Sequence, residues 1–254
     1  MNEVIKRLSG EPEVYHYPAF AAQGFVTIVS GRGGGVSAPP FHCLNMSDKV
    51  GDDPAAVAEN RARVMAAAGL GSLYLGRQVH GDGVTVIDAQ PPDDPQEADA
   101  VIVSVPGVAV GVLTADCVPI LVAEPSRGLA AAVHAGRRGA ERGITAKTIA
   151  LMRERFGADP ARLTAVIGPC IRACCYHVDP ETARNFASCC GAPYADNLDL
   201  VGVNLRQLEG SGLARAAILD SGVCVSCRND LFYSHRADRN TTGRFLSAIA
   251  LAGA

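Results

Sequence analysis

Between residues 73 and 135 the chain carries one short apolar run after another, and this succession limits its possible folds more than any other feature. Each run is rich in Val, Ile, Leu or Ala and is bounded by Gly, Pro or Asp, which is typical of strands rather than helices. The runs occupy residues 73–79, 83–88, 99–105, 108–116, 119–124 and 128–135. We therefore expect these segments to form hairpins of a β-sheet.

Segments on either side of these runs add further strands and several helices. Strands are expected over 24–30, 163–171 and 216–224, and helices over 52–70, 138–157, 179–191 and 204–212. Asp53 and Asp179 are each followed by proline, the pairing of N-cap and first helical residue that starts many helices. Residues 230–251 begin extended and end in either a strand or a helix. One α+β domain is the simplest interpretation.

The composition narrows the class of protein. The 254 residues are 48% hydrophobic, enough to bury a sizeable core. We expect a lead-in over residues 1–23 and a single domain over 24–254. A net charge of −3 and the absence of Trp argue against a nucleic-acid or membrane partner. No uncharged apolar stretch approaches the roughly 20 residues that a membrane span needs.

The nine cysteines point to a reducing compartment. The chain starts with a charged segment that lacks the apolar region of a signal peptide, so we expect a cytoplasmic protein with free thiols. In that setting cysteine serves as core filler, metal ligand or nucleophile.

A thiol and an imidazole lie at the ends of two neighbouring apolar runs. Cys117 begins one run and His134 ends the next, so a hairpin that turns near 125–128 would bring them together. His80 also follows an apolar run. A Cys and two His can hold Zn²⁺ with a fourth position open, the arrangement of a catalytic zinc that lowers the pKa of bound water to roughly 7. A metal-free Cys–His nucleophile–base pair or simple packing would give the same spacing.

Three other motifs carry weaker signals. Arg32 lies among glycines, where backbone amides and a guanidinium can bind an anion. The same sequence is also typical of a flexible loop without a ligand. The CxxC of residues 224–227 would need a second cysteine pair to hold a structural metal. Residues 170–175 offer only an irregular partner, which favours unliganded thiols. Residues 235–244 fit a solvated loop better than a lid or anion clamp.

Together, six ordered motifs resemble the bacterial laccase-domain family, also called multicopper polyphenol oxidase-like proteins. The motifs are SGRGGGVSAPPFHCLNMSDKVGDDPAAVAENR (30–61), RQVHGDGV (77–84), ADAVIVSVPGVAVGVLTADCVPILV (98–122), AAVHAGRRG (131–139), IGPCIRACCYHV (167–178) and FYSHRADRNTTGR (232–244). The resemblance spans roughly residues 24–250. It implies mixed β-sheets in a sandwich-like core flanked by helices, similar to the fold of toxin-type cysteine hydrolases.

The resemblance also implies an activity and its residues. Family members have been reassigned as zinc-dependent purine nucleoside phosphorylases that act on adenosine, inosine or methylthioadenosine and also deaminate adenosine. The family's metal ligands fall on His80, Cys117 and His134, which would also be catalytic. Within the same motifs, the expected contacts to the nucleoside and phosphate are Arg32, Asn45, Gln78 and Arg244.

The chain departs from the family pattern near the expected pocket. Arg137 replaces a common Trp, His177 replaces an acidic residue, and Ala237 replaces an Arg. These changes spare the metal ligands but bear on which substrate is preferred.

Three other functions compete with the nucleoside enzyme. The same residues would serve an amide hydrolase that removes a wrong L-serine from a UDP-MurNAc peptidoglycan precursor. A copper polyphenol oxidase would match the two-His, one-Cys set of a blue-copper site, but six His and no HxH pair are too few for a multicopper enzyme. A non-enzymatic metal-binding module is the remaining alternative.

Overall fold

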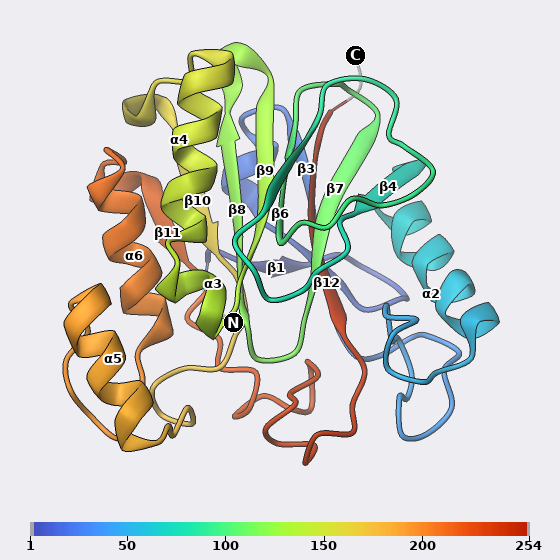
Figure 1. Cartoon of the computed structure of the whole chain (residues 1–254). Coiled ribbons are helices and arrows are strands. Elements are labelled where there is room, and N and C mark those ends of the chain that lie inside the picture. The colour runs from blue at the N-terminus through green and yellow to red at the C-terminus, as the bar shows by residue number, and fades with distance from the viewer. Residues whose placement is uncertain (1–2, 253–254) are drawn as a thin grey trace.

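Twelve strands form two six-stranded sheets that pack face to face in the computed structural model, which describes residues 3–252 (Figure 1). The first sheet has the order β1 (Lys6–Arg7), β2 (Val14–His16), β3 (Phe25–Ser30), β12 (Phe245–Leu251), β7 (Val108–Thr114) and β4 (Ser72–Leu75). The second has the order β11 (Ile218–Asp220), β10 (Thr164–Ile167), β8 (Val118–Glu124), β9 (Leu129–Ala135), β6 (Ala100–Val103) and β5 (Val84–Ile87).

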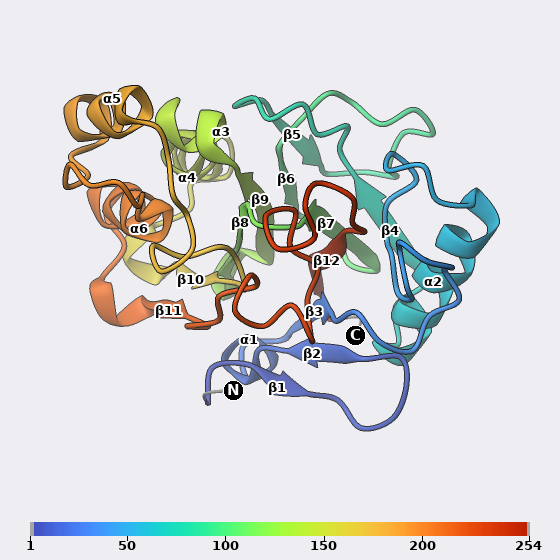
Figure 2. The same ribbon diagram turned by 90° about the horizontal axis from the view of Figure 1, so that it is seen from below.

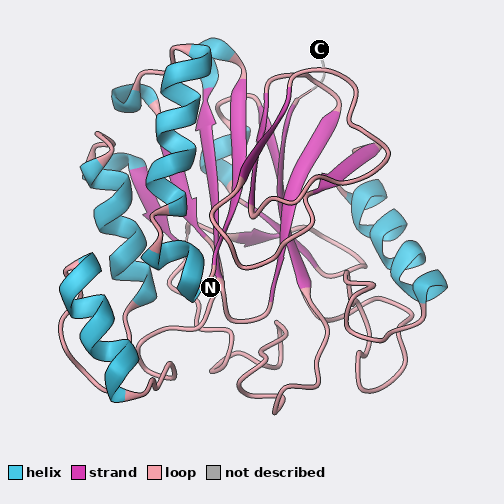
Figure 3. Ribbon diagram, in the orientation of Figure 1, coloured by secondary structure: helices cyan, strands magenta, loops and turns pink. Residues whose placement is uncertain are grey.

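Helices cover the outer face of each sheet (Figure 3). Helix α2 (Pro54–Ala67) lies on the first sheet, and α3 (Arg137–Glu141), α4 (Ile144–Phe156), α5 (Pro180–Cys190) and α6 (Leu200–Gly210) lie on the second. A short helix, α1 (Pro18–Ala21), precedes β3. The apolar core has three parts: one between the sheets and one beneath each helical layer. The predicted α+β class, with mixed sheets in a sandwich flanked by helices, is confirmed.

The expected hairpins are correct for one pair of strands only. Strands β8 and β9 pair antiparallel and are joined by a 3-10 turn at Pro125–Arg127. By contrast, β4 pairs with β7 and β5 with β6 in parallel, and the consecutive strands β7 and β8 belong to different sheets. Every residue of β8 and β9 is buried. A strand buried on both faces shows no alternation, so its sequence does not reveal which strand lies beside it.

Segments near both ends of the described residues belong to the first sheet. Residues 3–22, expected to be a loose lead-in, contribute β2, which pairs antiparallel with β3, and bury Tyr15, Tyr17 and Phe20 almost completely. The segment from 230 ends as β12, in the middle of the first sheet. The helix expected over 138–157 is split into α3 and α4 at Gly143, whose φ of +78° breaks the helical path.

Two long loops gather at the end of the sandwich where β8 begins and β9 ends (Figure 2). They are residues 168–179, after β10, and residues 221–244, between β11 and β12. Within residues 3–252, no helix combines the length and apolar character needed to cross a membrane.

Candidate active site

The pairing of β8 with β9 places Cys117 beside His134, as the sequence predicts. Pro119 lies opposite His134 and Val118 opposite Ala135, so Cys117 falls at the same edge. His80 reaches this edge from the loop between β4 and β5. One ligand atom from each of His80, Cys117 and His134 lies within 4.8 Å of the others. The two imidazole rings stand nearly perpendicular, with centroids 4.8 Å apart.

Asp99, which the sequence analysis did not single out, holds both histidines in place. Its carboxylate is fully buried and accepts hydrogen bonds from the backbone amides of Val79, His80 and Gly81 at 3.1, 3.0 and 2.7 Å. The same carboxylate lies 2.7 Å from Nδ1 of His134. Three successive amides aimed at one anion account for the left-handed backbone of His80, with φ of +58°. The one signal in the sequence is an acid directly before a buried strand.

The Asp99 contact determines which nitrogen of His134 faces the site. A carboxylate only accepts hydrogen bonds, so Nδ1 of His134 carries the proton and donates it. Nε2 is then the nitrogen that can bind a metal, which would displace the proton that Nε2 otherwise shares with Cys117. Metal-bound histidines commonly have such a carboxylate partner, which fixes ring orientation and raises ligand basicity.

The charges at this edge favour a thiolate. Burial raises the pKa of Cys117, but the charge of His134 and hydrogen bonds from His134 and His80 outweigh it and lower the pKa to about 6. Burial lowers the pKa of His134, but the Cys117 thiolate and the Asp99 hydrogen bond raise it to about 9. A thiolate is the form of cysteine that binds metals and acts as a nucleophile.

The donor set and its surroundings fit a single metal ion. Two imidazoles and a thiolate are the protein ligands of some catalytic zinc sites. Gly136 passes directly beside them: a Cβ there would lie 3.1 Å from the Cys117 sulfur and 3.3 Å from the His80 ring. A Cβ at 136 would force the sulfur or the ring to shift by a few tenths of an ångström, so glycine suits this close approach.

Asp116 connects the two long loops to the edge of the sheet that carries Cys117 and His134. Its carboxylate accepts hydrogen bonds from the Ser234 hydroxyl at 2.6 Å and the Arg236 amide at 2.7 Å, and its carbonyl accepts one from the Ile171 amide at 2.9 Å. Asp116 adopts a φ of +94°, which directs the chain into Cys117. The segment 235–244, expected to be a solvated loop, is therefore anchored beside the site.

Arg32 is placed differently from a free anion-binding group. Its guanidinium forms an ion pair with Asp238 at 3.2 Å, donates to the Asn229 side chain at 2.8 Å and stacks over Tyr233. Its side chain is only 15% exposed. These contacts make Arg32 a brace between the glycine-rich loop and residues 229–238.

Asn45 and Gln78 also bond within the protein. Asn45 is fully buried and accepts hydrogen bonds from the backbone amides of Ser47 and Arg244. Gln78 exchanges two hydrogen bonds with the backbone of Leu113, so its side chain extends the edge of β7. Both residues position neighbours of the site.

Arg244 is the predicted contact residue whose charge remains available. Its NH1 donates to the carbonyls of Thr242 and Gly243, and no residue within 3–252 accepts from its Nε or NH2. Burial lowers the pKa of Arg244, while the negative charges of Cys117 and Asp116 oppose this effect. Arg244 is therefore a half-buried cation within electrostatic reach of Cys117 and Asp116.

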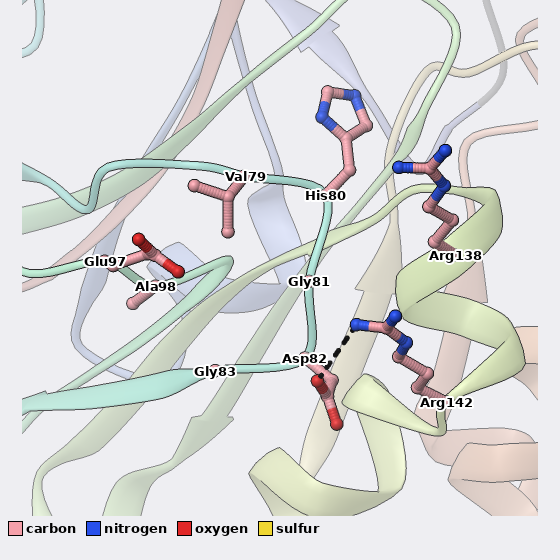
Figure 4. A pocket seen from close by; sticks show the side chains of 9 residues that line it. All are labelled: Val79, His80, Gly81, Asp82, Gly83, Glu97, Ala98, Arg138 and Arg142. Atoms are coloured by element: carbon pink, nitrogen blue, oxygen red, sulfur yellow. Dashed lines mark ion pairs between the residues drawn. The ribbon is translucent and has the colours of Figure 1, made fainter.

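A polar hollow of about 340 Å³ adjoins His80 (Figure 4). Its walls come from the loop 79–83, from residues 97–98 and from Arg138 and Arg142 at helix α3. Arg142 pairs with Asp82 at 3.7 Å, whereas Arg138 lines the same hollow as His80 and forms no ion pair within residues 3–252. Two arginines therefore line the hollow beside His80.

The fold and the site define a two-sheet sandwich protein with two imidazoles and a thiol gathered at one edge, close enough together to hold a metal ion. The chain belongs to the multi-copper polyphenol oxidoreductase laccase family, whose model matches residues 26–252. The family resemblance drawn from the motifs is confirmed.

Relatives and solved structures agree with this assignment. The chain is 42% identical over 231 residues to a purine nucleoside phosphorylase of Streptomyces coelicolor, covering 87% of this chain and 93% of that protein. It is 38% identical over 227 residues to a purine nucleoside phosphorylase of Mycobacterium tuberculosis, covering 87% and 90%. The crystal structure of YlmD from Geobacillus stearothermophilus superimposes with a TM-score of 0.91 at 30% identity, covering 99% and 100%.

Proposed function

We propose that this protein is a zinc-dependent purine nucleoside phosphorylase that acts on adenosine, inosine or methylthioadenosine and also deaminates adenosine. The observation that carries the proposal is the set of His80, Cys117 and His134, held by Asp99, in a chain whose relatives are named purine nucleoside phosphorylases. We expect the enzyme to work in the cytoplasm, where thiols stay reduced.

Zinc suits the donor set better than a multicopper centre does, although the family is titled for copper oxidoreductases. Two His and one Cys match both zinc and blue copper. A multicopper oxidase needs many further histidines, and the chain has six in all. Within residues 3–252, histidines take part in only one cluster of metal-binding side chains.

Phosphorolysis requires the site to bind an anion beside a nucleoside. An oxygen of phosphate forms a bond to C1′ of the ribose while the C1′–N9 bond breaks, and the purine leaves with the electron pair. Zinc, when bound, would supply a Lewis acid that stabilises the charge that develops as the C1′–N9 bond breaks. Arg244 would hold the phosphate, since its Nε and NH2 have no acceptor within residues 3–252 and a guanidinium binds phosphate in a forked manner.

Three further residues would hold Arg244 and its loop in place. Asn45 fixes the backbone of Arg244, and Asp116 fixes the loop that leads to it. Arg32 braces the same loop through Asp238. We assign these residues to positioning rather than to contact with the substrate.

The first test identifies the products. Zinc-loaded protein incubated with adenosine is expected to release adenine and ribose 1-phosphate only when phosphate is present, with inosine as a second product. Chromatography separates these products. If neither adenine nor inosine forms, the nucleoside assignment is wrong. Release of L-serine from the UDP-MurNAc precursor would then support the amide hydrolase.

A second prediction concerns phosphate binding. Arg244→Gln is expected to raise the KM for phosphate by roughly 10- to 100-fold, because a hydrogen bond to a charged group contributes about 1.5–3 kcal/mol. The KM for adenosine and the zinc content should change much less. The matched control is Arg239→Gln, which removes an exposed arginine from the same loop. Equal effects of the two substitutions on the phosphate KM would refute the assignment.

A further inference from the structure

Four cysteines converge at a second place, away from His80, Cys117 and His134. Cys174 and Cys175 lie in the loop after β10, and Cys224 and Cys227 follow β11. One sulfur from each lies within 4.8 Å of the others. The sulfur of Cys227 is 3.4 Å from that of Cys175 and 3.8 Å from that of Cys174, so all four are free thiols. The irregular motif of residues 170–175 therefore supplies the CxxC with a second cysteine pair, Cys174 and Cys175.

The backbone brings the two cysteine pairs together. Strands β10 and β11 pair in parallel, and the pairing continues beyond them as a bridge between Cys170 and Cys224. The Cys170 amide donates to the Val223 carbonyl, and the Val225 amide donates to the Cys170 carbonyl, at 3.2 and 3.0 Å. The cluster is therefore built by the sheet, and it does not depend on mobile side chains meeting by chance.

The spacing of the sulfurs matches a tetrahedral metal site. Zinc–sulfur bonds of about 2.3 Å at tetrahedral angles place the sulfurs roughly 3.8 Å apart. The two measured separations, 3.4 and 3.8 Å, lie close to this value. A disulfide would join two of the four sulfurs and leave the convergence of the others unexplained.

The exposure of two of the four cysteines argues against a role in core packing. Cys174 and Cys227 are exposed, so they do not fill an apolar core.

We propose that Cys174, Cys175, Cys224 and Cys227 bind a second zinc ion in a closed, structural tetrathiolate site. This zinc would fasten the loop 168–179 to the loop 221–244. Both loops contact Asp116: the Ile171 amide donates to its carbonyl, and Ser234 and Arg236 donate to its carboxylate. The second zinc therefore supports the rim of the active site without touching the substrate.

The test measures the zinc content per chain of the full-length protein by elemental mass spectrometry. The wild type should carry about two zinc ions per chain, and Cys227→Ser and Cys117→Ala should each lose about one. Cys189→Ser, which removes an exposed cysteine from helix α5, should lose none. A wild-type content of about one zinc that disappears in Cys117→Ala would overturn the proposal.

A second measurement covers the case in which Cys227→Ser fails to fold. The Cys117→Ala protein, reconstituted with Co²⁺, should show the intense sulfur-to-cobalt charge-transfer absorption of a tetrathiolate site. Absence of this absorption, or a disulfide among these four cysteines in protein prepared under reducing conditions, would also refute the site. Both readouts are independent of nucleoside turnover, so they do not depend on the proposed activity.

Discussion

Cys117→Ala is expected to remove the catalytic zinc and to lower phosphorolysis by at least about 10³-fold, since Lewis-acid stabilisation contributes several kcal/mol and each 1.36 kcal/mol is tenfold in rate. Cys117 is the only thiolate among the three ligands, and its charge balances that of the metal. Two histidines alone leave too few protein ligands for a zinc site of this type. Metal analysis and initial rates with adenosine and phosphate check the result.

The control for this substitution is Cys189→Ala, which removes an exposed thiol far along the chain from the ligands. It should keep both zinc content and turnover. A Cys117→Ala protein with full turnover would exclude both a metal ligand and a nucleophile at this position. A protein that keeps its zinc but loses turnover would instead identify Cys117 as a nucleophile, with His134 as its base.

Sequence reasoning brought Cys117 and His134 together because their placement follows from a local hairpin. Cys117 and His134 flank two adjacent runs joined by a short turn, so spacing alone brings them to one edge. The pairing of the other apolar runs could not be deduced from their spacing in the sequence. Parallel pairing of β4 with β7 and of β5 with β6 depends on crossovers and on packing between the two sheets.

The residues that position the site depend on contacts between distant segments. Asp99 meets the loop 79–81, and Asp116 meets Ser234 across more than a hundred residues. Arg32 lies in a motif suited to anion binding, yet its guanidinium forms an ion pair with Asp238. A motif shows which chemistry a side chain can perform, whereas its partners in the fold decide whether that chemistry is available.

Asp99→Asn is expected to weaken zinc binding by at least about 100-fold, because partners of metal-bound histidines commonly account for 10- to 100-fold and Asp99 also holds the His80 loop. One carboxylate oxygen accepts from His80 and His134, and the other accepts from Val79 and Gly81. Asparagine has a single acceptor oxygen. Its amide group would face two donors, and each buried donor left without an acceptor costs about 1–3 kcal/mol.

The effect of this substitution on stability should depend on pH in a defined direction. Burial raises the pKa of Asp99, but the hydrogen bond and charge of His134 and the amides of Gly81 and Val79 lower it below its ordinary value of 3.8. A lowered folded pKa means that the carboxylate stabilises the fold fully above pH 3.8 and that this contribution is lost as the pH falls through the folded value. Urea unfolding of metal-stripped wild type and variant should therefore show a large difference in stability at neutral pH that narrows in acid.

Asp88→Asn provides the matched control, because Asp88 is an exposed acid whose surface ion pair with Arg155 contributes only about 0–1 kcal/mol. It should leave zinc affinity unchanged and destabilise the fold little at any pH. If Asp99→Asn matched this control in zinc affinity, the histidines would not depend on their carboxylate. The metal site would then be organised by the pairing of β8 with β9 and the close approach of Gly136 alone.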